Sequence, residues 1–202
     1  NQSLMDGAGE GGLPHQLLGP SYALLRPEFA QAHQRARQRQ EAIFSVLVAF
    51  GGSDPEDFTA AAVEAAVAAL PGARIAVVLG ANYTNSQALQ RRWSDDGRVG
   101  FHVNSDKVCE LMEWADLGIG AAGGMTWERC AVGLPSIAVP VVANQEGIAQ
   151  GVQRAGAAMV VQKDQATSAG MAHGILAQIA KERPSANTAF GFDASEGKDV
   201  ES

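Results

Sequence analysis

Residues 115–140 decide the fold, and they read ADLGIGAAGGMTWERCAVGLPSIAVP. The run from Asp116 to Ala121 is short, apolar and rich in small residues, as expected of a parallel strand covered on both faces. A Gly-Gly pair then allows a tight turn that brings the backbone close to a ligand. A helix follows and ends before Pro135, and Ser136 to Val139 is predicted to be the next strand. The stretch therefore predicts a strand–turn–helix–strand unit.

The predicted helix after the glycines combines an apolar face with a carboxylate. Its apolar positions recur at i, i+3, i+4 and i+7, which is typical of a buried face, and they are Trp127, Cys130, Ala131 and Leu134. Thr126 is predicted to cap the helix. Glu128 falls off the apolar face in the first turn, where a carboxylate can accept hydrogen bonds from two neighbouring hydroxyls, as on a ribose. The free N–H groups of a helix N-terminus favour phosphate. The alternative is an ordinary βαβ unit in which Glu128 faces the positive end of the helix dipole.

Strand-like and helix-like segments alternate along the chain. The predicted strands are residues 43–50, 74–79, 99–103, 116–121, 136–139 and 158–161. The other predicted helices are residues 58–70, 86–93, 106–114, 145–155 and 166–181. This alternation predicts the α/β class, with a doubly wound, Rossmann-like parallel sheet and right-handed crossovers.

Length and composition limit the organisation of the chain. Its 202 residues suffice for one large domain with tails, and the net charge of −7 argues against nucleic acid and anionic membranes as partners. We expect residues 1–27 to be a remnant of a preceding domain and residues 28–41 to be a linker or helix with a solvated face. Residues 42–183 are the predicted binding domain, and residues 184–202 a loose tail.

Targeting signals and metal sites are not predicted. No apolar run is long enough for a membrane span, the N-terminus lacks a signal sequence, and the missing initiator Met suggests that the sequence starts within a longer protein. Cys109 and Cys130 lie on predicted helices without metal-like spacing, so we expect two reduced core thiols in a cytoplasmic protein. No metal or cofactor is expected.

Three loops at predicted strand ends have binding character, because ligands of such sheets lie beyond the carboxyl ends of the strands. The first loop is residues 51–54, which alternatively is a plain βα turn. The second loop is residues 101–104, which alternatively is a simple strand end with a half-exposed His102. The third loop is residues 141–145, where Asn144 alternatively caps a helix.

Four separated motifs resemble enzymes of the GT-B type that act on nucleotide sugars. They are LGPSYALLRPEF at 18–29, FGGSDP at 50–55, AAGGMTWERC at 121–130 and ANQ at 143–145. Within that fold the chain is more similar to a family of hydrolases in pseudaminic acid synthesis, which cleave UDP-2,4-diacetamido-2,4,6-trideoxy-β-L-altropyranose. The resemblance implies that the chain is the C-terminal, UDP-binding half of such an enzyme.

The resemblance also implies roles for individual residues. Glu128 would hold the ribose of UDP, the backbone at Val103 would pair with the uracil, and Asn144 would contact the sugar or phosphate. The predicted substrate-binding residues are Gly51, Gly52, Ser53, Asp54, Phe101, Val103, Gly123, Gly124, Thr126, Glu128, Asn144 and Gln145. Met125 and Asp57 depart from the family pattern, where smaller or amide side chains are expected.

The general base of this family is a His in a Gly-rich loop of the N-terminal domain, and no residue here matches it. The four histidines, His15, His33, His102 and His173, lie outside that motif. We therefore predict no catalytic residue in this chain, with a UDP-sugar and the missing N-terminal domain as its partners. Two alternatives stay open: a UDP-N-acetylhexosamine glycosyltransferase of the same fold, and a nucleotide-binding module without catalysis of its own.

Overall fold

The computed structural model describes residues 23–36 and 42–180, and within them six strands form one parallel sheet. The strands are β1 Ser45–Ala49, β2 Arg74–Leu79, β3 Val99–Val103, β4 Leu117–Ala121, β5 Ser136–Val139 and β6 Ala158–Val160. Their spatial order is β3-β2-β1-β4-β5-β6, so the order reverses between β1 and β4. Both neighbours of β1 pair with it in parallel register, Val46 opposite Ile75 on one side and Leu117 on the other.

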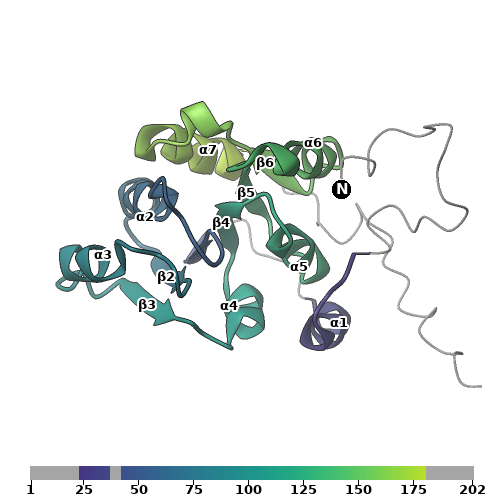
Figure 1. Ribbon diagram of the computed structural model, residues 1–202, viewed down its shortest axis with the longest axis horizontal. Helices are drawn as coiled ribbons and strands as arrows, with labels where there is room; N and C mark the ends of the chain where they lie inside the picture. The colour runs from purple at the N-terminus through teal and green to yellow at the C-terminus, as the bar shows by residue number, and fades with distance from the viewer. Residues whose placement is uncertain (1–22, 37–41, 181–202) are drawn as a thin grey trace, which may run out of the picture.

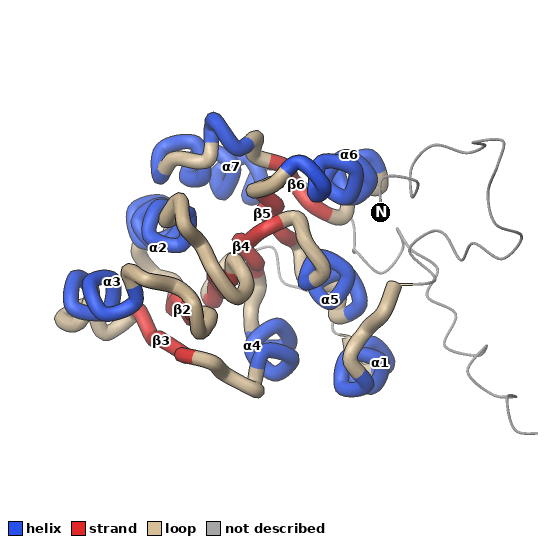
Figure 2. Tube along the Cα trace, in the orientation of Figure 1, coloured by secondary structure: helices blue, strands red, loops and turns tan. Residues whose placement is uncertain are grey.

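Helices cover both faces of this sheet (Figures 1 and 2). They are α1 Pro27–Gln34, α2 Phe58–Ala69, α3 Ser86–Arg92, α4 Val108–Trp114, α5 Met125–Ala131, α6 Glu146–Arg154 and α7 Ser168–Ala180, with 3-10 turns η3 Ala143–Gln145 and η4 Lys163–Gln165. The α2, α3 and α7 helices pack on one face. The α4, α5 and α6 helices pack on the other, where α1 lies against α4 and α5. The doubly wound parallel sheet predicted from the sequence is confirmed.

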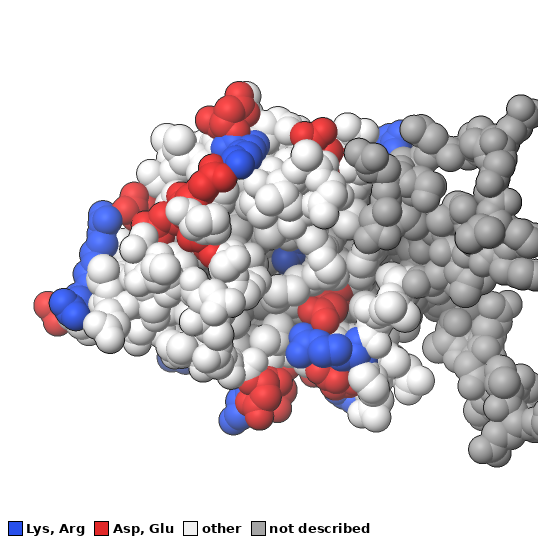
Figure 3. Space-filling view, viewed as in Figure 1, with Lys and Arg blue, Asp and Glu red and all other residues white. Residues whose placement is uncertain are grey.

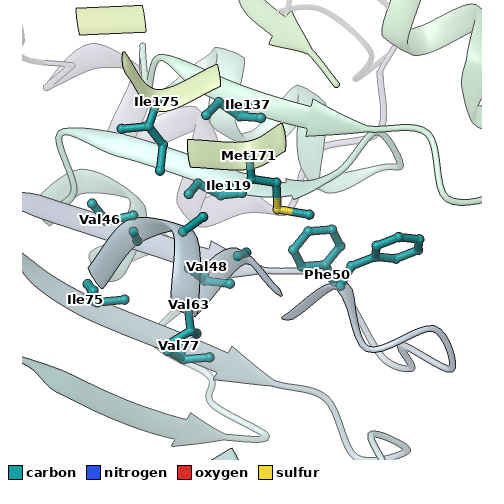
Figure 4. Close-up of a cluster of buried hydrophobic side chains, with 14 of the residues drawn as sticks. Val46, Val48, Phe50, Val63, Ile75, Val77, Ile119, Ile137, Met171 and Ile175 are labelled. Atoms are coloured by element: carbon teal, nitrogen blue, oxygen red, sulfur yellow. The ribbon is translucent and has the colours of Figure 1, made fainter. Parts of the chain in front are cut away.

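The face under α2 and α7 holds the largest apolar core. Branched side chains of β1, β2, β4 and β5 meet the two helices there, as Figure 4 shows for Val46, Ile75, Ile119, Ile137 and Ile175. Each of these five side chains is at most 1% exposed. Burial of branched aliphatic residues at this density is the main source of the domain's stability.

The opposite face of β4 is built from glycines. A Cβ at Gly120 would lie 2.0 Å from the carbonyl oxygen of Ala49, and one at Gly118 would lie 3.0 Å from Cδ of Arg129. The missing side chains therefore leave room for the long side chain of Arg129 on α5, which is 2% exposed. At the start of β4, Asp116 Oδ2 accepts hydrogen bonds from the Ser45 backbone N–H and hydroxyl, which fixes the beginning of β1 against β4.

The segment predicted as a solvated linker is in part a packed helix. Phe29 and Ala32 of α1 are fully buried against α4 and α5, and the Nδ1 atom of His33 lies 2.7 Å from the carbonyl oxygen of Ala131. The prediction of a solvated face is wrong for α1, because two apolar residues three positions apart suffice to dock a two-turn helix. Three parts of the chain lie outside the described residues. They are residues 1–22 of the expected N-terminal remnant, which include His15, then residues 37–41, and the expected tail from residue 184.

Among the described helices, the longest is α7 with 13 residues, and none has the length and apolar character needed to cross a membrane.

Candidate functional site

A pocket of about 390 Å³ opens at the carboxyl ends of the central strands. The loop after β1 contributes Gly52, Ser53 and Asp54, and the loop after β5 contributes Val142 and Gln145. The structure thus brings together two of the three loops that the sequence singled out. The pocket lies beside the reversal of strand order between β1 and β4, which is where doubly wound sheets bind their ligands.

Glycines allow the loop after β1 to lie against the loop after β2. Gly51 has a φ of 94°, which favours glycine. A Cβ at Gly80 would lie 2.4 Å from the carbonyl oxygen of Gly51, and the N–H of Asn82 donates to the carbonyl oxygen of Gly52 at 3.0 Å. Gly52 and Ser53 remain exposed and line the pocket.

The Asp54 carboxylate is engaged by the start of α2. Its Oδ1 accepts from the N–H of Phe58 at 3.1 Å and its Oδ2 from the N–H of Thr59 at 2.6 Å, which caps the helix. Any contribution of Asp54 to a ligand would therefore come from its backbone. The neighbouring Asp57 has a φ of 61° and accepts a hydrogen bond from the hydroxyl of Tyr83. Burial, together with this bond, raises the pKa of Tyr83.

Gln145 joins the pocket to the glycine turn after β4. Its Oε1 accepts from the N–H of Val141 at 3.0 Å, and its Nε2 lies 3.1 Å from where a Cβ of Gly123 would be. A side chain at Gly123 would make the end of the Gln145 side chain shift by a few tenths of an ångström, so glycine favours this close approach. Gly124 and Asn144 are exposed on the same rim. The structure therefore brings predicted binding residues of three segments, 51–54, 123–124 and 144–145, to one edge of the sheet.

Thr126 is not the helix cap that the sequence predicted. The α5 helix begins at Met125 with Gly124 at its N-cap position, and no side chain caps it. Thr126 is instead buried inside the first turn, where its Oγ1 accepts a hydrogen bond from Nη2 of Arg129 at 3.0 Å. The helix begins two residues earlier than a Thr126 cap would place it, because glycine turns the chain without a side-chain acceptor.

Arg129 is a buried cation with few partners in the described part of the chain. Its Nη2 also donates to the carbonyl oxygen of Ala121 at 2.9 Å, whereas Nε and Nη1 are buried without a hydrogen-bond partner. Burial lowers the pKa of Arg129 to about 10. The sequence pattern did not indicate this enclosure, because Arg129 is not one of the residues of the predicted apolar face.

The predicted apolar face of α5 is partly confirmed. Cys130, Ala131 and Leu134 are buried. Trp127 is only half buried, and it packs at the border of a small cluster with Ala149 and Val152 of α6. The reason is that α5 is short and lies between α1 and α6, so its outer side is not fully covered.

Glu128 is 9% exposed and forms an ion pair that the sequence did not predict. Arg26, in the residues before α1, donates from Nε to Oε1 at 2.9 Å and from Nη2 to Oε2 at 3.2 Å. The hydrogen bond with Glu128 raises the pKa of Arg26. In Figure 3 acidic and basic side chains alternate over the region of α1 and α5, around a largely uncharged centre. Both residues belong to quoted motifs, but their contact spans 102 positions and has no local signal.

The loop after β3 lies at the far edge of the sheet from the glycine turn. Phe101 is half buried and Val103 is 50% exposed, and neither lines the central pocket. His102 points to the other face, where it lines a separate groove of about 390 Å³ with Arg74 and Arg98. The placement of the uracil at Val103 stays a prediction.

The remaining candidate groups do not assemble a catalytic set among the described residues. His33 contacts the backbone of α5, and His173 is exposed on α7. Cys109 and Cys130 are buried free thiols on α4 and α5. Residues 23–36 and 42–180 contain no group of three or more His, Cys, Asp or Glu residues arranged to hold a metal ion.

The fold is that of a Rossmann-like domain, as in the C-terminal half of the GT-B architecture. The chain belongs to the family described as the glycosyltransferase family 28 C-terminal domain, whose model matches residues 46–199. The chain is also similar in sequence to two curated proteins. An uncharacterized protein of Methanocaldococcus jannaschii is 31% identical over 59% of this chain and 26% of its own length. The spore coat polysaccharide biosynthesis protein SpsG of Bacillus subtilis is 27% identical over 70% of this chain and 42% of its own length.

Solved structures show the same fold. The calicheamicin glycosyltransferase CalG4 matches with a TM-score of 0.62 and 19% identity, over 81% of this chain and 41% of that one. Anabaena HepE, solved in complex with UDP and glucose, matches with a TM-score of 0.56 and 17% identity, over 87% of this chain and 49% of that one. The chain spans less than half the length of these relatives and structures.

Proposed function

We propose that this chain is the UDP-binding half of a UDP-sugar hydrolase, of the kind that releases UDP and 2,4-diacetamido-2,4,6-trideoxy-L-altrose in pseudaminic acid synthesis. The observation that carries the proposal is the rim at the strand reversal, where Gly52, Ser53 and Gln145 line one pocket and Gln145 touches the Gly123 turn. The motifs that build this rim are the same ones on which the resemblance to the hydrolases rests.

Each predicted binding segment has a proposed partner in the substrate. The backbone of Gly123 and Gly124 approaches the diphosphate, and the Glu128 carboxylate accepts hydrogen bonds from the two ribose hydroxyls. The loop after β3 at Val103 pairs with the base, and Asn144 contacts the sugar or phosphate. The relative that makes spore coat polysaccharide and the neighbour solved with UDP and glucose support a nucleotide-sugar substrate class.

The proposed reaction is the attack of water on the anomeric carbon of the sugar. The bond between that carbon and the diphosphate oxygen breaks, UDP leaves with the electron pair, and a general base takes the proton from water. We propose that a separate N-terminal domain supplies this base. General-base catalysis commonly contributes about 10²–10⁴-fold, so the 202 residues alone should not turn over the UDP-sugar at a useful rate.

Binding of UDP to the chain tests the first half of the proposal. Glu128→Gln keeps the size of the side chain and removes its charge, and each hydrogen bond to a charged acceptor contributes about 1.5–3 kcal/mol. We expect UDP affinity to fall at least tenfold in a titration followed by NMR. Glu64→Gln, which removes a charge from α2 where Glu64 pairs with Arg92, is the matched control. Equal affinity for Glu128→Gln and the parent would reject the ribose contact.

A glycosyltransferase is the second candidate, because the matching family is one of glycosyltransferase domains. The two reactions differ in the acceptor, which is water for the hydrolase and a hydroxyl of a second molecule for the transferase. The assay measures UDP release from the altropyranose nucleotide and from UDP-N-acetylglucosamine, with and without an added N-terminal domain of the hydrolase family. UDP release that needs no acceptor but requires the added domain supports the hydrolase. Robust UDP release by the chain alone would refute the proposal that a separate N-terminal domain supplies the general base.

A further inference from the structure

The ion pair between Arg26 and Glu128 places a guanidinium where the proposed ribose would bind. Both carboxylate oxygens accept hydrogen bonds from the one arginine, at 2.9 and 3.2 Å. The Glu128 side chain is only 11% exposed, so a ligand that needs both carboxylate oxygens competes with Arg26 for them.

A guanidinium edge and a vicinal diol present the same pattern to a carboxylate. Each offers two parallel donors, one for each carboxylate oxygen, and a bidentate arginine fills that end of the group. Two hydroxyls on adjacent ribose carbons need the same end, with the same spacing of donors. The arginine and the diol therefore cannot hold Glu128 in this manner at the same time.

Arg26 has other partners within reach when it leaves Glu128. Its side chain is 44% exposed, its Nη1 lies 3.3 Å from Oε1 of Glu28, and its guanidinium lies 4.8 Å from the ring centre of Phe29. Because the Arg26 side of the pair is 44% exposed, the ion pair contributes only modestly on balance, whereas the nearly buried Glu128 carboxylate needs donors. The free energy of exchanging the guanidinium for a diol is therefore close to zero, and the binding of a ligand with two hydroxyls can drive the exchange.

We propose that Arg26 holds the ribose position of Glu128 when no nucleotide is bound, and that the vicinal diol of a ribonucleotide displaces it. This inference rests on the proposed function, and it makes Arg26 a specificity-determining residue. A nucleotide with both hydroxyls replaces both hydrogen bonds, whereas one without them leaves the Arg26–Glu128 pair in place. The return of Arg26 to Glu128 also helps to release UDP.

The experiment titrates the 202-residue chain with UDP and with 2′,3′-dideoxy-UDP, followed by NMR so that weak binding is measurable. Arg26→Met keeps the aliphatic stem over Phe29 and removes both donors. We expect it to bind UDP about three- to tenfold more tightly than the parent, since a partly exposed pair no longer competes, and to bind the dideoxy nucleotide unchanged. Arg26→Lys keeps the positive charge but lacks the paired donors of a guanidinium. Its UDP affinity should lie between that of the parent and that of Arg26→Met.

Arg92→Met is the matched control. Arg92 also pairs with a glutamate, Glu64, and also lies near an aromatic ring, that of Trp93, but on α3 at the other end of the sheet. It should leave both affinities unchanged. Thermal unfolding of each variant confirms that the folded chain is being titrated.

The other outcomes separate the two proposals. Weaker UDP binding by Arg26→Met, with the parent binding normally, overturns the displacement and makes Arg26 a positioning residue for Glu128, while the UDP site stands. An equal increase in the affinity of Arg26→Met for UDP and for 2′,3′-dideoxy-UDP also overturns the displacement, because the loss of the positive charge alone would then explain the effect. Failure of the parent and of every variant to bind UDP overturns the proposed function and the inference with it.

Discussion

The two faces of the central strand β4 are built by opposite means. On β4, Leu117 and Ile119 face α2 and α7, whereas Gly118 and Gly120 face α5. The first face is filled by branched aliphatic side chains that strands supply in alternation. The second face is filled by the side chain of Arg129 from α5. Its Nη2 donates hydrogen bonds to the carbonyl oxygen of Ala121 and to Oγ1 of Thr126.

This difference means that one face mainly stabilises the domain, whereas the other face helps to build the edge of the candidate site. The α2–α7 face gains its stability from apolar burial. The α5 face encloses a cation at a desolvation cost, and α5 itself follows directly on the glycine turn. Three substitutions, from the largest expected effect to the smallest, test this contrast.

Ile119→Ala should lower the free energy of unfolding by about 3–4 kcal/mol, since it opens a cavity in a core where the residue is 1% exposed. Urea unfolding measures the change. Ile179→Ala on α7 is the matched control, because Ile179 is 44% exposed and its loss should change stability by about 0.5 kcal/mol or less. Similar losses for both variants would mean that this face is not the main source of stability.

Cys130→Ala should make stability less dependent on alkaline pH. Burial raises the pKa of the Cys130 thiol from 9.0 to about 11, so between these values the unfolded chain loses a proton that the folded chain keeps. This contribution is fully present below about pH 9 and is lost as the pH rises through the folded pKa, a difference of about 2–3 kcal/mol. Urea unfolding from pH 8 to 11 measures it.

The control for the alkaline effect is Cys109→Ala. The Cys109 thiol lies 3.7 Å from the carbonyl oxygen of Glu28 under α1, and burial raises its pKa as well. We expect a smaller flattening of the pH curve, because Cys109 lies at the edge of its cluster. Parallel curves for Cys130→Ala and the parent would show that the thiol is not the titrating group.

Arg129→Met should change stability by only about 1 kcal/mol or less. It removes two hydrogen bonds but also relieves the burial of two guanidinium nitrogens without partners. Arg129→Lys should be less stable than Arg129→Met, since a compact ammonium is harder to desolvate. Thermal unfolding ranks the variants, and a loss of several kcal/mol in Arg129→Met would show that the cation itself stabilises the α5 face.

The local pattern was sufficient for the strands and for much of the rim. The predicted ranges of β2, β3 and β5, Arg74–Leu79, Val99–Val103 and Ser136–Val139, are the observed ones. Alternation of short apolar runs with helical segments fixes the parallel sheet, and glycines at strand ends mark close backbone approaches. The lining of one pocket by Gly52, Ser53 and Gln145 follows from those two rules.

The sequence by itself determined the order of the elements, the doubly wound class and the loops that reach the rim, because periodicity and turn chemistry act over a few residues. Only the tertiary structure decided that α1 docks through Phe29, that Arg26 reaches Glu128, and that Arg129 is enclosed above Gly120. These contacts join residues whose side chains carry no local mark of their partner. Their energies depend on burial, and burial exists only once the layers have packed.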